Sequence, residues 1–84
     1  MFTVYVIKNV NSGKMYTGYT SDLDKRLKRH NQELPNKKSS FTSKNPGSWM
    51  LVYKEEFINR EDAFFREKEL KTGKGREFVK SILK

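Results

Sequence analysis

The chain has 84 residues, a length that suits one small domain and leaves little room for a large hydrophobic core. It has no cysteine, which excludes disulfides and thiolate zinc sites, and no apolar run of the roughly 20 residues that span a membrane. The 18 Lys and Arg residues outnumber the 10 Asp and Glu residues, and the formal net charge of +8 favours a polyanionic partner, most commonly nucleic acid. We therefore expect one soluble, cytoplasmic domain over residues 1–84, without membrane contact.

Residues 3–20 predict a β-hairpin, because two runs rich in β-branched and aromatic residues flank an Asn-Ser-Gly turn signal at 11–13. Tyr5 and Tyr16 are separated by an odd number of positions. Since side chains alternate along a strand, a turn with an even number of loop residues would place both phenol rings on one face of the sheet. An odd loop without a bulge would place them on opposite faces.

The stretch 21–24 (Ser-Asp-Leu-Asp) resembles a capping box with Ser21 as the cap, and it predicts the start of a helix. Arg26 and His30 lie one helical turn apart, so they share one flank of that helix. The helix follows the second strand almost without a linker, so its first turns should lie close to the strand that carries Tyr16. The alternative, in which Arg26 and His30 are only solvated helix residues, stays open at this point.

The rest of the chain predicts a long loop, a strand and two helices. Residues 33–48 are rich in Ser, Pro, Asn and Gly, and the lysines of this loop either follow a nucleic-acid backbone or are merely solvated. Trp49–Phe57 reads as a third strand. Asn59 caps a second helix that runs to about Lys71, residues 72–75 (Thr-Gly-Lys-Gly) end it, and Arg76–Lys84 predicts a third, amphipathic helix.

These elements predict an α/β (α+β) fold in the order β-β-α-β-α-α. A small three-stranded sheet, mixed or antiparallel, is flanked by three helices, which we expect in one layer. Replacing Phe78 by Ala should destabilise such a fold by about 3 kcal/mol. The expected core residues are Val4, Val6, Leu23, Leu27, Leu51, Val52, Ala63, Leu70, Phe78 and Ile82.

Glu67 shares a helical stripe with Ala63 and Leu70, which are expected to face the sheet. A carboxylate in such a position costs free energy unless a cation or hydrogen-bond donors meet it. One explanation is a structural ion pair. The other is a single-carboxylate Mg²⁺ site, in which the ion keeps most of its waters and takes further ligands from a substrate phosphate. The candidate cations for an ion pair are Arg26, Arg66 and Lys71.

In combination these motifs resemble the GIY-YIG endonuclease domain. The likeness is carried by Thr3-Val4-Tyr5, Tyr16-Thr17-Gly18, Arg26, His30 and the run Ala63-x-x-Arg66-Glu67-x-x-Leu70-Lys71. The chain is most similar to small stand-alone bacterial proteins related to the nuclease module of the excision-repair nuclease, which often end in a Gly-x-Gly-Arg-like stretch such as 73–76. Both triplets keep the tyrosine but not every eponymous letter, and Tyr19 stands where some relatives have a lysine.

The resemblance implies a metal-dependent phosphodiesterase of the DNA-repair type that cleaves DNA with one Mg²⁺ or Mn²⁺ ion. Glu67 would be the sole protein ligand of the metal, and Arg26 would hold the scissile phosphate. Tyr16 would activate the attacking water, with Tyr5 and His30 orienting water and assisting proton transfer. His30 is the competing candidate for the general base, because an imidazole titrates nearer neutrality than a phenol.

Two other classes of function remain open. One is a nucleic-acid-binding module with this fold and little or no catalysis, and the other is a protein-interaction adaptor with an exposed aromatic face. DNA rather than RNA is the expected partner, and a monomer is the expected state. Further contacts with nucleic acid are expected from the basic residues Lys14, Arg29, Lys37, Lys38, Lys44, Arg66, Lys71 and Arg76.

Overall fold

The computed structural model describes residues 1–31 and 48–82. Three antiparallel strands, β1 (Phe2–Asn9), β2 (Met15–Thr20) and β3 (Trp49–Phe57), form one sheet in the order β2-β1-β3. The helices are α1 (Leu23–His30), α3 (Arg60–Leu70) and α4 (Gly73–Ile82). The predicted order β-β-α-β-α-α is confirmed, and the sheet is the antiparallel one of the two expected kinds. No helix in these two ranges is long and apolar enough to cross a membrane.

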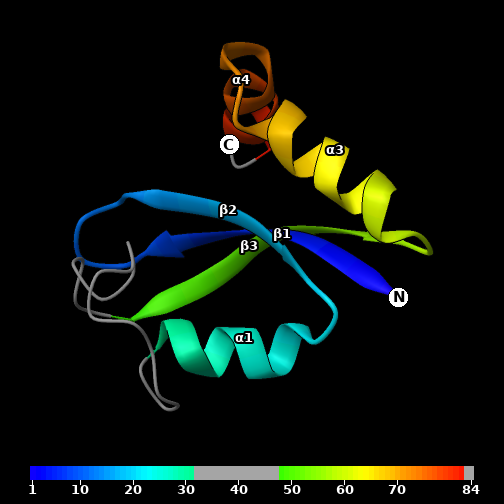
Figure 1. Cartoon of the computed structure of the whole chain (residues 1–84). Coiled ribbons are helices and arrows are strands. Elements are labelled where there is room, and N and C mark those ends of the chain that lie inside the picture. The colour runs from blue at the N-terminus through cyan, green and yellow to red at the C-terminus, as the bar shows by residue number, and fades with distance from the viewer. Residues whose placement is uncertain (32–47, 83–84) are drawn as a thin grey trace.

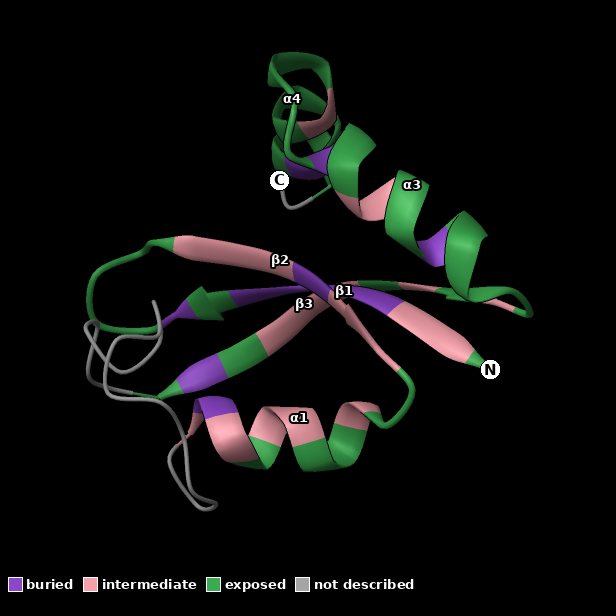
Figure 2. Cartoon of the chain, viewed as in Figure 1, coloured by how far each residue is buried: buried purple, intermediate pink, exposed green. Residues whose placement is uncertain are grey.

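The helices cover both faces of the sheet, which corrects the expectation of a single helical layer. Helix α1 lies on one face, and α3 and α4 lie on the other (Figure 1). The reason is the central strand β1, whose apolar residues point alternately to the two faces. Val4 and Val6 face α3, whereas Tyr5 and Ile7 face α1, and all four are at most 1% exposed. Figure 2 shows that β1 carries most of the buried positions of the sheet.

On the α3 and α4 face, Ala63, Leu70 and Val79 pack against Val4 and Val6. Phe78 and Ile82, two of the expected core residues, are instead 39% and 41% exposed.

Gly75 explains this correction, because a Cβ there would clash with the backbone at the end of α3. The close approach turns Gly75 toward the end of α3, and Val79, one helical turn later, packs into the core beside Leu70. Phe78 is left at the flank of α4, where it packs edge-on against Tyr53, with ring centroids 5.8 Å apart.

On the α1 face, the buried aromatic and aliphatic residues are Tyr5, Ile7 and Trp49. All three are absent from the expected core, which places only Leu23, Leu27 and Leu51 in this cluster. The other expected core residues are half-buried rather than fully buried. These are Leu23, Leu27, Leu51 and Val52.

Two helix starts differ from the sequence-based prediction. Asp22, not Ser21, caps α1, because the Asp22 carboxylate accepts a hydrogen bond of 3.1 Å from the backbone N–H of Lys25. Helix α4 begins at Gly73 rather than Arg76. The Thr72 hydroxyl accepts a hydrogen bond of 3.2 Å from the Gly75 N–H, so the stretch expected to separate the helices caps α4 instead.

Asn59 is the N-cap residue of α3, as predicted, although its side chain makes no capping hydrogen bond.

The end of α1 is tied to the start of β3 through a single side chain. The Asn31 carboxamide accepts a hydrogen bond of 2.7 Å from the Trp49 N–H and donates one of 3.1 Å to the Trp49 carbonyl. This pair of hydrogen bonds fixes α1 against the edge of the sheet formed by β3. We call this contact the Asn31 clamp.

Candidate active site

The hairpin brings Tyr5 and Tyr16 to the same face of the sheet. Tyr5 pairs with Gly18 and Ile7 pairs with Tyr16, so both rings project toward α1, with centroids 6.3 Å apart. The even-loop alternative is therefore confirmed. Gly18 lies beneath both rings, and a Cβ at this position would come within 2.8 Å of the Tyr5 hydroxyl oxygen and 3.0 Å of Tyr16 Cε2. A glycine is needed here because the rings occupy the space of a side chain.

Helix α1 brings Arg26 and His30 to the two phenols. The Tyr5 hydroxyl lies 2.8 Å from His30 Nε2, and Arg26 Nε donates a hydrogen bond of 3.2 Å to the Tyr5 oxygen. The His30 ring also lies 5.0 Å from the Tyr16 ring, centroid to centroid. His30 is only 6% exposed, so the alternative of two merely solvated helix residues is wrong.

Burial sets the protonation states of this cluster. It raises the pKa of Tyr5 to about 12, because the hydrogen bond and charge of Arg26 offset only part of the desolvation. Burial, followed by the nearby charge of Arg26, lowers the pKa of His30 to about 4. Although burial disfavours its charge, Arg26 has a pKa above its usual value because of its contacts with Tyr5 and Tyr16. At neutral pH the cluster thus holds a protonated phenol, a neutral imidazole and a cationic guanidinium.

These states give the hydrogen bonds a direction. The Tyr5 oxygen accepts from Arg26, so its own proton is available for donation to His30 Nε2. The imidazole proton then lies on Nδ1, a buried atom without a hydrogen-bond partner among the described residues. Tyr5 and His30 are therefore fixed in position by a chain of hydrogen bonds that starts at Arg26.

A hollow of about 450 Å³ opens beside this cluster, and we call it the site hollow. Tyr16, Arg26 and Glu67 line it together, whereas Tyr5 and His30 lie behind it. The three lining side chains come from β2, α1 and α3. Helices α1 and α3 lie on opposite faces of the sheet (Figure 1), and residues of both line the hollow beside the edge strand β2. The site hollow is consequently open at the edge of the sheet.

Arg60, at the start of α3, also lines the site hollow and was missed as a site residue from the sequence. Hydrogen bonding to the Tyr19 hydroxyl raises the pKa of this exposed guanidinium. The resemblance points to Tyr19 as the position where some relatives carry a lysine. Arg60 thus brings a cation to the neighbourhood of Tyr19 from a different element. The signal in the sequence was a basic residue directly after the cap of α3.

Glu67 is paired with Lys71, with Nζ 2.9 Å from Oε1, and its side chain is 16% exposed. The ion-pair explanation is therefore correct for Lys71, and the carboxylate still lines the site hollow. Arg66, another candidate partner, instead pairs with Glu55 at 2.9 Å.

The described residues contain no group of three or more Asp, Glu, His or Cys side chains that could hold a metal ion. A site built from several protein ligands is therefore absent from this part of the chain. Glu67 fits a different kind of site, because Mg²⁺ is commonly bound through one or two carboxylates together with water and substrate phosphate. The Glu67 carboxylate is a hard oxygen donor in the lining of an open hollow, so it meets that requirement. A metal ion there would share the carboxylate with Lys71.

The expected nucleic-acid contacts fall in several places. Lys71 and Arg76 line a second hollow on the α3 and α4 face. Lys14 is exposed beside the hairpin turn, Arg29 is half-buried on α1, and Arg66 is engaged by Glu55. Three further expected contacts, Lys37, Lys38 and Lys44, lie outside the described residues.

The fold, with an open hollow at the sheet edge, fits the nuclease-type class that the sequence resembles. A family model described as the GIY-YIG catalytic domain matches residues 1–80. The chain belongs to the GIY-YIG catalytic domain family, a family of nucleases, and the resemblance drawn from its motifs is confirmed.

Relatives of similar size match almost the whole chain. UPF0213 protein SERP0126 of Staphylococcus epidermidis is 35% identical over 79 residues, which cover 94% of this chain and 90% of the relative. UPF0213 protein SSP2268 of Staphylococcus saprophyticus is 34% identical over the same shares of the two chains. The solution NMR structure of UPF0213 protein BH0048 from Bacillus halodurans matches with a TM-score of 0.56 and 30% sequence identity. The match covers 98% of this chain and 85% of the BH0048 chain.

Proposed function

We propose that this protein is an endonuclease that hydrolyses phosphodiester bonds of DNA in the site hollow. The observation that carries the proposal is the convergence of a phenol, a guanidinium and a carboxylate, from Tyr16, Arg26 and Glu67, on one open hollow. The formal net charge of +8 favours the approach of a polyanion. Membership of a nuclease family supports the same reaction class.

Arg26 holds the scissile phosphate in this proposal. Its guanidinium offers several N–H donors in a planar fork that matches two phosphate oxygens, and its Nε is already fixed by Tyr5. Arg60, which lines the same hollow, adds a second cation. Positive charge is needed here because the transition state of phosphodiester hydrolysis gathers negative charge on the phosphate oxygens.

Tyr16 is our candidate for the residue that orients and deprotonates the attacking water. The water oxygen forms a bond to phosphorus as its proton passes to the Tyr16 oxygen, which must be deprotonated for this step. The bond from phosphorus to the leaving sugar oxygen breaks, and the leaving oxygen takes up a proton from solvent water. Tyr5 and His30 are positioning residues in this scheme. With a pKa of about 12, Tyr5 keeps its proton, and with a pKa of about 4, His30 is too weak a base to compete for the role.

Glu67 would hold a single Mg²⁺ or Mn²⁺ ion, with water and substrate phosphate as the other ligands. When bound, such an ion supplies positive charge to the phosphate oxygens during the reaction. Lys71 balances the Glu67 carboxylate when no ion is bound, and its ammonium group stays near the hollow.

The test is cleavage of labelled single-stranded and branched DNA by the purified protein with Mg²⁺ or Mn²⁺. Glu67→Gln should lower the rate by about a hundredfold or more while DNA binding is retained. The matched control is Glu69→Gln, the same change on the same helix at a side chain that is 68% exposed, which should cut as the unmodified protein does. If the unmodified protein cleaves DNA no faster than the Glu67→Gln variant does, the nuclease proposal is wrong.

A DNA-binding module without catalysis is the second candidate, and the Glu67–Lys71 ion pair favours it, because a neutralised carboxylate attracts a metal ion less strongly. Both candidates predict affinity that falls steeply with salt, so binding alone does not separate them. Salt-dependent DNA binding without cleavage at any Mg²⁺ or Mn²⁺ concentration would select this second candidate.

A further inference from the structure

A second hollow, of about 470 Å³, lies on the face of the sheet that α3 and α4 cover. We call it the α4 cleft and define it by an apolar floor, Val6, Leu70 and Val79, and a basic rim, Lys71, Arg76 and Lys80. The nuclease proposal uses only Lys71 of these residues. The combination of floor and rim indicates what kind of ligand the cleft can take.

The floor belongs to the hydrophobic core. Val6, Leu70 and Val79 are between 1% and 3% exposed, so they close the base of the cleft. Met15, beside them on β2, is half-buried and lines the cleft, so it contributes apolar surface that a ligand can contact. Such a surface offers no strong hydrogen-bonding group, but it can pack against a flat ring and remove it from water. The floor therefore suits an apolar or aromatic group.

The rim is cationic on one side of the cleft. Arg76 and Lys80 are one helical turn apart on α4, so they point the same way, and Lys71 adds a third charge from the end of α3. All three residues are exposed. An inorganic anion would contact the basic rim but gain nothing from the apolar floor. An apolar ligand would pack on the floor but leave the charges of the rim unpaired. A nucleotide, with a flat base and a phosphate, satisfies both.

The α4 cleft adjoins the site hollow through Tyr16, a residue that lines both. Lys71 links them as well, because its Nζ lies 2.9 Å from Glu67 Oε1 and 5.9 Å from the centroid of the Tyr16 ring. A strand whose scissile phosphate lies in the site hollow can therefore send a neighbouring nucleotide past Tyr16 into the cleft.

We propose that the α4 cleft binds one unstacked nucleotide next to the bond that is cleaved. A base inside a duplex reaches a hollow between a helix and a sheet only after it leaves the stack, and that step is easiest where the base is already unpaired. The protein should then prefer single strands, overhangs or bulges to continuous duplex. This substrate preference rests on the proposed nuclease function, whereas nucleotide binding in the cleft does not.

Nucleotide binding can be measured directly by following backbone amide signals in NMR titrations. Deoxyadenosine monophosphate, deoxyadenosine and inorganic phosphate are the three probes. The nucleotide should shift the amides of Met15, Thr17 and Val79 and bind at least about tenfold more tightly than phosphate, because the base adds its own packing energy. If phosphate alone shifts these amides as much as the nucleotide does, the cleft binds anions and does not recognise the base, which contradicts the proposal. The absence of shifts at these amides would also overturn it.

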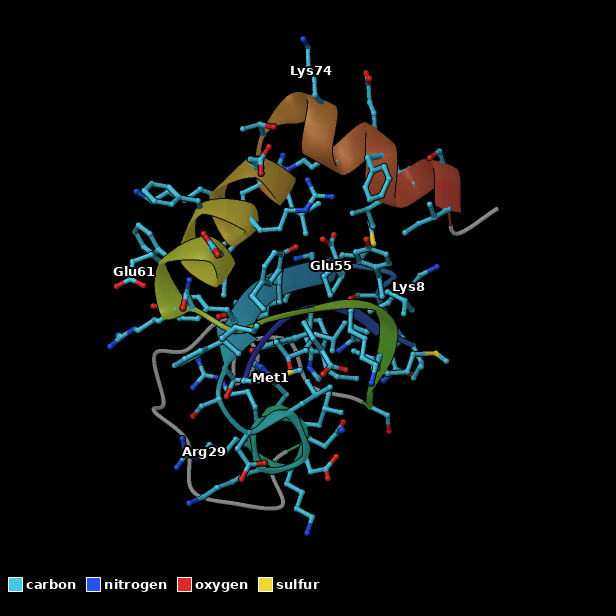
Figure 3. All side chains as sticks on the ribbon, turned by 90° about the vertical axis from the view of Figure 1, so that its right-hand side faces the viewer. Met1, Lys8, Arg29, Glu55, Glu61 and Lys74 are labelled. Atoms are coloured by element: carbon cyan, nitrogen blue, oxygen red, sulfur yellow. The ribbon has the colours of Figure 1, made fainter. Side chains whose placement is uncertain are left out.

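Substrate preference is tested with two lysine variants on α4. Lys80→Ala removes a rim charge, and Lys74→Ala removes the same charge at a side chain that points away from the sheet in Figure 3. Lys80→Ala should lower the preference for a duplex with one unpaired nucleotide over the fully paired duplex by several-fold, and Lys74→Ala should leave it unchanged. Equal effects would show that general charge, not the cleft, is responsible.

Thr17→Trp, which puts a large ring into the cleft from a half-buried position on the edge strand β2, provides a second test. It should abolish the nucleotide-induced shifts while thermal unfolding confirms a folded protein. An oligomeric state in this variant that differs from that of the unmodified protein would instead identify the cleft as a protein interface. Cleavage without nucleotide binding would overturn only this inference, and nucleotide binding without cleavage would overturn only the nuclease function.

Discussion

Tyr5 and His30 share a buried hydrogen bond of 2.8 Å between the central strand and α1. The bond joins two groups that are both neutral at pH 7, since the pKa of the phenol is raised and that of the imidazole is lowered. Arg26 donates to the same phenol and fixes the direction of the bond. The pair therefore holds Arg26 in place in the wall of the site hollow. The protonation state of His30 should be visible in the stability of the fold.

The first prediction concerns pH and stability. The pKa of His30 falls from 6.5 in the unfolded chain to about 4 in the folded protein, because of burial and the charge of Arg26. As the pH drops from about 6.5 to about 4, His30 binds a proton in the unfolded chain but not in the folded protein. The free energy of unfolding therefore decreases. The loss from this group should reach up to ~3 kcal/mol near pH 4. Urea unfolding at several pH values measures it.

The control for this measurement is His30→Gln, which keeps a polar side chain but cannot titrate. Carboxylates also titrate near pH 4, so the difference between the two proteins isolates the histidine. The variant should show a shallower decline of stability between pH 6.5 and 4. Parallel curves would mean that the imidazole is not held neutral by its surroundings.

Gly18→Ala should disturb the two phenols. The new methyl group would lie 2.8 Å from the Tyr5 hydroxyl oxygen and 3.0 Å from Tyr16, closer than atoms normally pack. We expect a destabilisation of ~1–3 kcal/mol and slower DNA cleavage. Gly73→Ala is the control, because nothing lies within 4 Å of the added methyl, and it should be neutral or slightly stabilising. Equal melting temperatures for both variants would contradict the packing described around Gly18.

Lys71→Met should strengthen metal binding. The change keeps an unbranched stem but removes the ammonium group that lies 2.9 Å from the Glu67 carboxylate. A divalent ion then no longer competes with a built-in cation, so we expect the Kd for Mn²⁺ to fall several-fold. Calorimetric titration of Mn²⁺ into the DNA-free protein measures this change, and Lys74→Met is the charge-matched comparison. Unchanged Mn²⁺ affinity would argue against Glu67 as a ligand.

Leu70 and Phe78 should differ in what they contribute to stability. Leu70 is 2% exposed between α3 and the sheet, so Leu70→Ala should cost ~2–5 kcal/mol through lost burial and a cavity. Phe78 is 39% exposed, packs edge-on against Tyr53 and lies under the Arg66 guanidinium, so Phe78→Ala should cost only ~1–2 kcal/mol. This value replaces the larger one expected from periodicity alone. Chemical unfolding of both variants decides whether their order is correct.

Much of the fold follows from short-range patterns. The alternation of side chains in the hairpin is enough to bring Tyr5 and Tyr16 to one face, and β3 runs from Trp49 to Phe57 as predicted, because β-branched and aromatic residues cluster there. Glu67 stands out in the sequence because it shares a helical stripe with Ala63 and Leu70, whereas the role of Arg26 came from the resemblance. Both residues line the site hollow.

What the sequence could not predict depends on contacts between distant elements. The depth of burial of Tyr5 and His30 arises only once helices cover both faces of the sheet. Arg60 reaches the site hollow because α3 begins beside the end of β2, which no local pattern encodes. Likewise, the close approach at Gly75 decides which side of α4 faces inward.

The Asn31 clamp has a consequence for how this family can diversify. Its two hydrogen bonds to Trp49 join the end of α1 directly to the start of β3, so the chain between these residues leaves and re-enters the fold at fixed points. Loop closure costs only ~0.6 kcal/mol more for each doubling of length. A recognition peptide or a whole module could be grafted between Asn31 and Trp49 without altering the distance from Arg26 to the phenols, which makes this span suited to adding a new binding specificity.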